Sequence, residues 1–230
     1  MSAVEIKYFS DVLCIWAYIS QARIDEIRKK FDGAVRIEHR FCSVFGDTQN
    51  KIETTWKDKG GYEGFNAHLL QVAKKFPHVT VHPQVWRETR PASSASPHLF
   101  LKAVQQCEVE PAQLGASAHG ASQFELVMWA LRRAFFQDCR DISRWDVQRD
   151  IAQRLGADVD SIDERIRSGV AFAGLVADYQ EADKMRIEGS PSLVLNEGRQ
   201  KLYGNVGFRL IEANVKSLLQ APGVDDASWC

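Results

Sequence analysis

The sequence has no marked excess of either charge and no long apolar run. Its 230 residues contain 29 Lys plus Arg and 30 Asp plus Glu, which gives a formal net charge of −1 at pH 7. A nucleic-acid-binding protein should carry a basic excess on at least one face, so this balance argues against that class. No apolar stretch approaches the roughly 18 residues of a membrane-spanning helix. We therefore expect neither a nucleic-acid partner nor a membrane partner.

The sequence also lacks the marks of a disulfide-stapled secreted protein. The opening segment MSAVEIKYFSD has no basic stretch, and charged residues interrupt what would be the apolar core of a secretory signal. Five cysteines are an odd number, which argues against a structural disulfide framework. We expect a cytoplasmic location. Each cysteine is then a core residue, a reactive thiol or an incidental one.

What is present is an ordinary globular composition arranged in three blocks. The chain is 45% hydrophobic and 26% charged, and it is long enough to bury a sizeable core. Residues 3–9 and 34–41 have the alternation of strands, and the segment 14–31 between them has helical periodicity. A strand–helix–strand unit of this length fits a right-handed parallel crossover.

The middle and the end of the chain differ from this opening. Helical patterns follow one another through the middle, at about 64–76, 94–107, 122–137, 143–155, 159–168 and 171–186. Two short strands, 192–196 and 200–204, are joined by a turn at Glu197-Gly198, and a helix at about 207–220 follows. The order predicts an α/β, thioredoxin-like fold with an inserted all-α helical domain. The predicted boundaries are 1–60 and 173–230 for the two parts of the thioredoxin-like domain, and 61–172 for the insertion.

Cys14 is the first candidate for chemistry. It follows the first strand and begins the first helix, where unpaired backbone N–H groups and the helix dipole favour a thiolate. A lowered pKa and a raised nucleophilicity follow from that position, although Asp11 nearby opposes them. The competing interpretation is a buried hydrophobic cysteine, which is a common fate of a free thiol.

Two further features favour a reactive thiol. Trp16 and Tyr18 place large aromatic side chains beside Cys14, as a pocket lining would. Ser190-Pro191 precedes a short apolar strand and is a candidate cis peptide bond. The backbone polar groups of the residue before such a proline are free to pair with an extended peptide or a thiol ligand.

The segments Ser10–Ile19 and Gly189–Asn196, SDVLCIWAYI and GSPSLVLN, resemble the DsbA-like branch of the thioredoxin superfamily. That branch includes cytoplasmic dithiol oxidoreductases, 2-hydroxychromene-2-carboxylate isomerases and kappa-class glutathione transferases. The oxidoreductases carry Cys-x-x-Cys, whereas this chain has Cys-Ile-Trp-Ala, with Ala17 at the resolving position. A dithiol mechanism within one such motif is therefore excluded, and monothiol chemistry at Cys14 remains.

The resemblance implies glutathione as a cosubstrate and no metal. It implies that Ser190 and Pro191 hold the cysteinyl part of glutathione, beside Asp11, Trp16 and Ala17. The turn before the last helix is the expected site for the γ-glutamyl carboxylate, with Asn205 and Arg209 as the candidate ligands. The competing interpretation is that Gly204 and Gly207 merely shape this turn.

Two further residues are candidate pocket walls. Cys42 follows the second strand, so its loop should lie at the same sheet edge as Cys14, where it forms a wall or acts as a resolving thiol. By the resemblance, Ser94 at the start of a helix faces the site. His78 and His82 lie close together but lack the further ligands of a metal site, so we expect loop histidines.

Two functions fit the sequence. One is a single-cysteine thiol oxidoreductase, or a glutathione-dependent transferase or isomerase, acting through Cys14 on a small-molecule thiol or electrophile. The other is a non-catalytic thioredoxin-like module that docks a peptide or partner at the Pro191 edge. The substrate is not identified by the residues, and the transferase and isomerase relatives suggest a homodimer.

Overall fold

The computed structural model describes residues 4–108 and 121–220. Its sheet has four strands in the order β2-β1-β3-β4. They are β1 (Val4–Ser10), β2 (Val35–Phe41), β3 (Ser192–Leu195) and β4 (Gln200–Tyr203). β1 and β2 are parallel, with Ser10 opposite Phe41, whereas β3 is antiparallel to both β1 and β4. The carboxyl ends of β1, β2 and β4 therefore meet at one edge of the sheet, where β3 begins.

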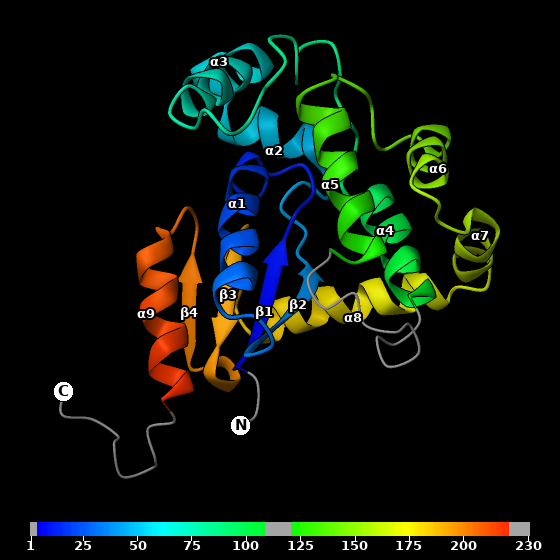
Figure 1. Ribbon diagram of the computed structural model, residues 1–230. Coiled ribbons are helices and arrows are strands. Elements are labelled where there is room, and N and C mark those ends of the chain that lie inside the picture. The colour runs from blue at the N-terminus through cyan, green and yellow to red at the C-terminus, as the bar shows by residue number, and fades with distance from the viewer. Residues whose placement is uncertain (1–3, 109–120, 221–230) are drawn as a thin grey trace.

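The helices fall into two sets (Figure 1). α1 (Ile15–Lys30), α8 (Val170–Lys184) and α9 (Phe208–Leu219) cover the sheet. The others are α2 (Thr48–Thr55), α3 (Gly61–Ala73), α4 (Ala95–Cys107), α5 (Gln123–Phe136), α6 (Trp145–Arg154) and α7 (Val159–Arg167), with short 3₁₀ turns at Lys57–Lys59 and Asn196–Gly198. α2 and α3 lie beyond the sheet edge at which α1 begins (Figure 1). No helix within the described ranges is long and apolar enough to cross a membrane.

Alternation along the strands divides the core. Ile6 and Tyr8 of β1 point to one face, where they pack with Ile24 of α1 and Ile211 of α9. Phe9 points to the other face, which α8 covers. A larger cluster joins the start of α1 to the inserted helices. The start of α1 therefore lies where the sheet core and the helical core meet.

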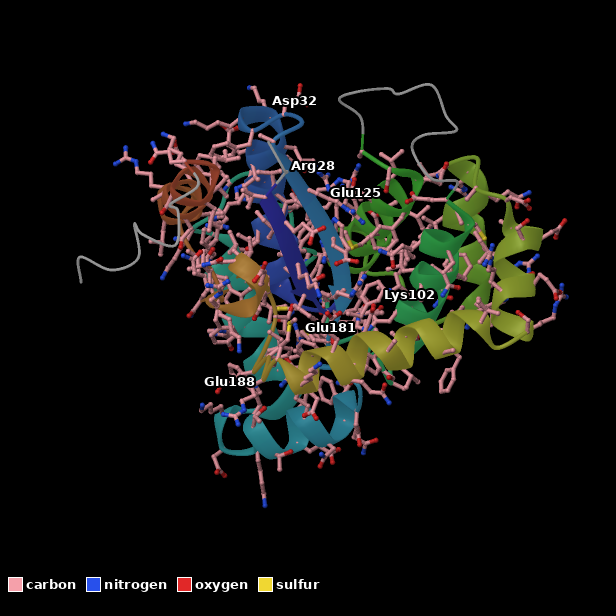
Figure 2. The ribbon with its side chains drawn as sticks, turned by 90° about the horizontal axis from the view of Figure 1, so that it is seen from below. Arg28, Asp32, Lys102, Glu125, Glu181 and Glu188 are labelled. Carbon is pink, nitrogen blue, oxygen red and sulfur yellow. The ribbon has the colours of Figure 1, made fainter. Side chains whose placement is uncertain are left out.

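Buried ion pairs attach the inserted helices to the sheet. Asp178 of α8 pairs with Lys102 of α4 at 2.5 Å, and both side chains are buried. Glu125 of α5 pairs with Arg28 of α1 and lies 2.7 Å from His39 of β2. Figure 2 shows Arg28, Glu125 and Lys102 from below, at the junction between the two parts. Removing one member of a buried pair leaves an uncompensated charge, so these pairs constrain how the two parts fit together.

The structure confirms the predicted fold class. Each predicted strand and helix is present, including the antiparallel hairpin of β3 and β4. The helix α2 was not predicted. The boundaries proposed at 60/61 and 172/173 stay predictions. The second boundary falls inside α8. This helix packs against α4 and α7 of the insertion and also against β2 of the sheet.

Candidate active site

Cys14 occupies the N-cap position of α1. Its backbone is extended (φ −83°, ψ 119°), its amide donates to the Asp11 carbonyl, and the helix proper begins at Ile15. The side chain is 5% exposed. Its Sγ donates a hydrogen bond of 3.1 Å to the carbonyl oxygen of Ser190. The sequence therefore predicts the position of this thiol correctly, and its burial agrees with the competing interpretation of a buried cysteine.

Burial raises the pKa of the Cys14 thiol, and the charge of Asp11 acts in the same direction. Hydrogen bonding by Ser190 and by the amides of Ala17 and Trp16 lowers it. Because desolvation is the largest of these effects, the net direction is upward. The expectation of a lowered pKa is therefore wrong for this structure. The helix terminus favours the thiolate, but burial outweighs it.

The segment before β3 forms the opposite wall of the site. The Ser190–Pro191 peptide bond is cis, as the Gly-Ser-Pro pattern suggests. Ser190 is 7% exposed, and its hydroxyl accepts a hydrogen bond of 2.8 Å from the amide of Asp11. The carbonyl of Pro191 accepts from the amide of Gly204 at 2.8 Å. One short segment thus touches the start of α1 on one side and the turn before α9 on the other.

Asp11 joins three loops. Its Oδ1 accepts from the amide of Leu13, and its Oδ2 accepts from the amides of Val44 and Phe45 and from the hydroxyl of Ser94. The side chain is fully buried. All four bonds come from the protein, and the expected contact of Asp11 with glutathione stays a prediction. Asp11 fixes the loops that surround Cys14.

Ser94 is also fully buried, and its hydroxyl is 2.7 Å from the Asp11 carboxylate. It stands at the N-cap of α4, without a capping bond from its side chain. Ser94 therefore helps to build the site through Asp11. Its role as a pocket wall stays a prediction.

His98 on α4 belongs to the same network and was not predicted. Its Nε2 accepts a hydrogen bond of 3.0 Å from the amide of Val12, so the proton lies on Nδ1, which faces the hydroxyl of Tyr179 at 3.0 Å. Burial is the main cause that lowers the pKa of His98 to about 4. This ring is therefore neutral at neutral pH and positions the backbone between β1 and Cys14. In the sequence, the position of His98 resembles that of the other buried residues of α4, so it does not stand out as a site residue.

The two residues that follow Cys14 in the motif lie differently. Trp16 is half-buried and meets the ring of Phe76 edge-on, with 6.1 Å between centroids. Ala17 is fully buried and carries no group that could react. Their predicted contacts with glutathione stay predictions, although Trp16 presents the larger surface for one.

Asn205 and Arg209 are both exposed, in the turn before α9 and in its first turn. The bond between Gly204 and Pro191 places this turn beside the cis peptide. Gly204 has φ +79°, a conformation that glycine adopts without strain. A turn-shaping role for Gly204 agrees with this φ, whereas ligand binding by the two polar residues and the competing interpretation both stay predictions.

Cys42 lies at the expected sheet edge but packs on the other face. It is 4% exposed and clusters with Phe9, Val194 and Ala182 under α8. Its Sγ is 4.0 Å from the carbonyl oxygen of Gly189, and burial raises the pKa of its thiol. Both Cys14 and Cys42 are free thiols. The packing favours a wall over a resolving thiol.

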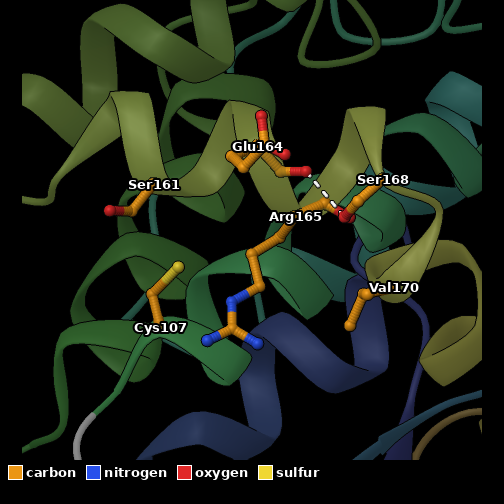
Figure 3. Close-up of a pocket in the computed structure, with 6 residues that line it drawn as sticks. All are labelled: Cys107, Ser161, Glu164, Arg165, Ser168 and Val170. Atoms are coloured by element: carbon orange, nitrogen blue, oxygen red, sulfur yellow. Dashed lines mark hydrogen bonds between the residues drawn. The ribbon is translucent and has the colours of Figure 1, made fainter.

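The other candidates lie outside this site. The ring of His78 faces the carbonyl of Ile19, and His82 accepts from the amide of Gln84. Within residues 4–108 and 121–220, no group of His, Cys, Asp and Glu side chains could hold a metal ion. A hollow of about 420 Å³ lies at the far end of α4 from His98 (Figure 3). It is lined by Cys107, Ser161, Glu164, Arg165, Ser168 and Val170.

Comparisons with known proteins agree with this architecture. Several solved structures have the same fold at low sequence identity. A probable DsbA oxidoreductase from Streptomyces coelicolor is 17% identical, with a TM-score of 0.71 over 95% of this chain and 91% of that one. The cytosolic disulfide reductase DsbM from Pseudomonas aeruginosa, solved with GSH, is 16% identical, with a TM-score of 0.64 over 94% and 99% of the two chains. A 2-hydroxychromene-2-carboxylate isomerase is 13% identical, with a TM-score of 0.62 over 97% and 100%.

Among curated protein sequences, none matches the chain. The family model described as the DsbA-like thioredoxin domain matches residues 5–216, which include both halves of the sheet and the inserted helices. The chain therefore belongs to the DsbA-like thioredoxin family.

Proposed function

We propose that this protein is a single-cysteine thiol enzyme that reacts through Cys14 and uses glutathione. The observation that carries the proposal is the hydrogen bond between the Cys14 thiol and the carbonyl of Ser190 at the start of α1. This contact puts the sulfur against backbone groups that a thiol-containing peptide would bind. Family membership and similarity to oxidoreductase and isomerase structures support enzyme chemistry of this class.

The simplest reaction is disulfide exchange in two steps. The Cys14 thiolate attacks one sulfur of a substrate disulfide, forms a mixed disulfide and releases the other sulfur as a thiolate. A glutathione thiolate then attacks the substrate sulfur of the mixed disulfide, and Cys14 leaves as a thiolate. Each step breaks one S–S bond and forms one, so no further oxidant is needed. Because Ala17 has no thiol and Cys42 packs in the cluster under α8, the proposed resolving thiol is glutathione from solution.

Glutathione is the proposed cosubstrate because of the surroundings of the thiol. The Ser190–Pro191 segment offers backbone groups to its cysteinyl part, and the turn that holds Asn205 and Arg209 lies next to it. Arg209 is a cation in the first turn of α9, where the amino end of a helix also favours an anion. Similarity to a disulfide reductase solved with GSH supports this choice.

A mass-spectrometric experiment tests the proposal. The purified protein is incubated with oxidised glutathione, and every cysteine peptide is analysed. We expect one glutathionyl group on Cys14, removed again by reduced glutathione, and none on that peptide in Cys14→Ser. The matched control is Cys139→Ser, a free cysteine outside the site, in which Cys14 modification should be unchanged. Modification at other cysteines with none at Cys14 would refute the proposal.

One observation favours a second function, a binding module without turnover. Cys14 is 5% exposed and burial raises its pKa, as for an inert buried thiol. If this is the function, Cys14 alkylates more slowly than an unperturbed thiol of pKa about 8.5, and oxidised glutathione leaves it unmodified. Peptide binding at the Pro191 edge would then survive Cys14→Ser unchanged.

A further inference from the structure

Arg132 on α5 is a buried cation whose hydrogen-bond partners in the described part of the chain are neutral. The side chain is fully buried. Its two terminal nitrogens donate to neutral oxygens, to Oγ of Ser10 at 3.0 Å and to Oε1 of Gln21 at 3.2 Å. Among the described residues, no carboxylate forms an ion pair with it. A guanidinium keeps its proton in proteins, so this positive charge stays in the interior.

The surroundings of Arg132 contain further unused polar groups. Within residues 4–108 and 121–220, its Nε has no hydrogen-bond partner, and neither has the hydroxyl of Tyr8, which is also fully buried. Buried donors without acceptors are uncommon in folded proteins and are a recognised feature of catalytic sites. An anion that forms nearby during a reaction would compensate such an arrangement.

The two contacts of Arg132 flank the start of α1. Ser10 ends β1 four residues before Cys14, and Gln21 lies two helical turns after Cys14 on the same face of α1. The guanidinium therefore lies behind the N-terminal turns of α1, toward the protein interior. The acidic groups whose charges act on Arg132 are Tyr8, Cys14 and Asp11.

Among the described residues, Arg132 is the cation whose charge is coupled to Cys14. Asp11 and Cys42 are acids, His98 is neutral in this structure, and Arg23 of α1 acts on Tyr8. The carboxylate of Asp11 already accepts four hydrogen bonds. Of the groups that surround Arg132, Cys14 is the one whose sulfur becomes an anion in the proposed reaction.

We propose that Arg132 is a positioning residue whose buried charge stabilises the thiolate of Cys14. The inference rests on the proposed role of Cys14 as the reacting thiol. For two charges about 10 Å apart at an effective dielectric constant of about 20, Coulomb's law changes the ratio of thiolate to thiol roughly tenfold. The effect is thus large enough to offset part of the opposing effect of burial.

The test measures the alkylation rate of the Cys14 peptide against pH, by mass spectrometry, in intact protein. Arg132→Met removes the charge and keeps much of the volume, and Arg132→Lys keeps the charge. Tyr8→Phe is the matched control, because it removes a neighbouring buried hydroxyl and leaves the cation. Circular dichroism checks that each variant is folded.

We expect Arg132→Met to raise the pKa of Cys14 by about one unit. Arg132→Lys should recover most of that shift, and Tyr8→Phe should leave the pKa close to that of the unaltered protein. An unchanged pKa in folded Arg132→Met would overturn the inference. So would an equal shift in Tyr8→Phe, because it would indicate a packing effect. Failure of Cys14 to accept glutathione would refute the proposed function alone, since this pKa is measured without glutathione.

Discussion

The thiol of Cys14 and the carbonyl of Ser190 lie 3.1 Å apart, although 176 residues separate them in the chain. The hydroxyl of the same serine accepts from the amide of Asp11, three residues before the thiol. One residue thus holds both ends of the turn that leads into α1. The reactivity of Cys14 should therefore respond to changes at Ser190 that leave α1 itself untouched.

Ser190→Ala should raise the pKa of Cys14 and destabilise the fold. The hydroxyl lowers the pKa of the thiol, and its loss leaves the buried amide of Asp11 without a partner. An unsatisfied group of this kind costs about 1–3 kcal/mol. Urea unfolding measures the stability, and pH-dependent alkylation measures the pKa. Ser192→Ala is the control, because it removes a buried hydroxyl that bonds to Gly189. A pKa change of the same size in both variants would contradict the argument.

Asp11→Asn should lower both the free energy of unfolding and the pKa of the Cys14 thiol. Asparagine keeps one acceptor oxygen and replaces the other with an NH2 group, so it cannot accept at both positions that Asp11 uses, from Leu13 on one oxygen and from Val44 and Phe45 on the other. The free energy of unfolding should therefore fall by about 2–5 kcal/mol. The charge of Asp11 raises the pKa of Cys14, so its loss should lower that pKa. Ser94→Ala removes one hydrogen bond and no charge, and should reduce stability alone. A Cys14 pKa that rises in Asp11→Asn would exclude this electrostatic role.

Stability should fall with acid because of His98. Its pKa is about 4 in the folded protein and about 6.5 in an unfolded chain. The unfolded chain therefore takes up the proton first, so the contribution is complete above about pH 6.5 and is lost as the pH falls toward 4. The loss amounts to about 3 kcal/mol. Urea titrations at a series of pH values should show a flatter dependence for His98→Gln. Equal slopes in the two proteins would show that other groups carry the effect.

Ala17→Cys should create a dithiol pair. Residues three apart in a helix have Cα atoms about 5 Å apart, within the range of disulfides. The introduced thiol should expel glutathione from a mixed disulfide at Cys14, so that a linked peptide replaces the glutathionylated one. Mass spectrometry distinguishes the two products. The same change in a Cys14→Ser background should give neither, and persistent glutathionylation at Cys14 would show that the buried methyl position cannot be reached.

The fold was predictable because each long element has its own apolar period. α1, α5 and α8 begin and end within two residues of the predicted bounds. α2 was missed because its sequence, TQNKIETT, has a single buried apolar residue, Ile52. It forms next to the inserted helices, with Asp47 as its N-cap. Tertiary packing and a cap determine that helix, and apolar periodicity does not.

The site was only partly predictable, for a different reason. Cys14, Ser190 and Pro191 stand out because their residue types are unusual at a helix start and before a strand. Arg132 does not, since the pair Arg132-Arg133 resembles a solvent-facing patch, yet the first is buried and the second exposed. Its contacts lie more than 100 positions away, and no local pattern records them.

The distance in sequence between Cys14 and Ser190 has a consequence for synthesis. Ribosomes add about 5–20 residues per second, so Ser190, 176 positions after Cys14, is added about 9–35 s later. Throughout that interval the sheet lacks β3, and the thiol lacks the carbonyl that receives its hydrogen. In the nascent chain, the Cys14 thiol is therefore present before the segment that accepts its hydrogen bond and completes the site. We therefore expect Cys14 to be oxidised more easily in incompletely synthesised chains than in the folded protein.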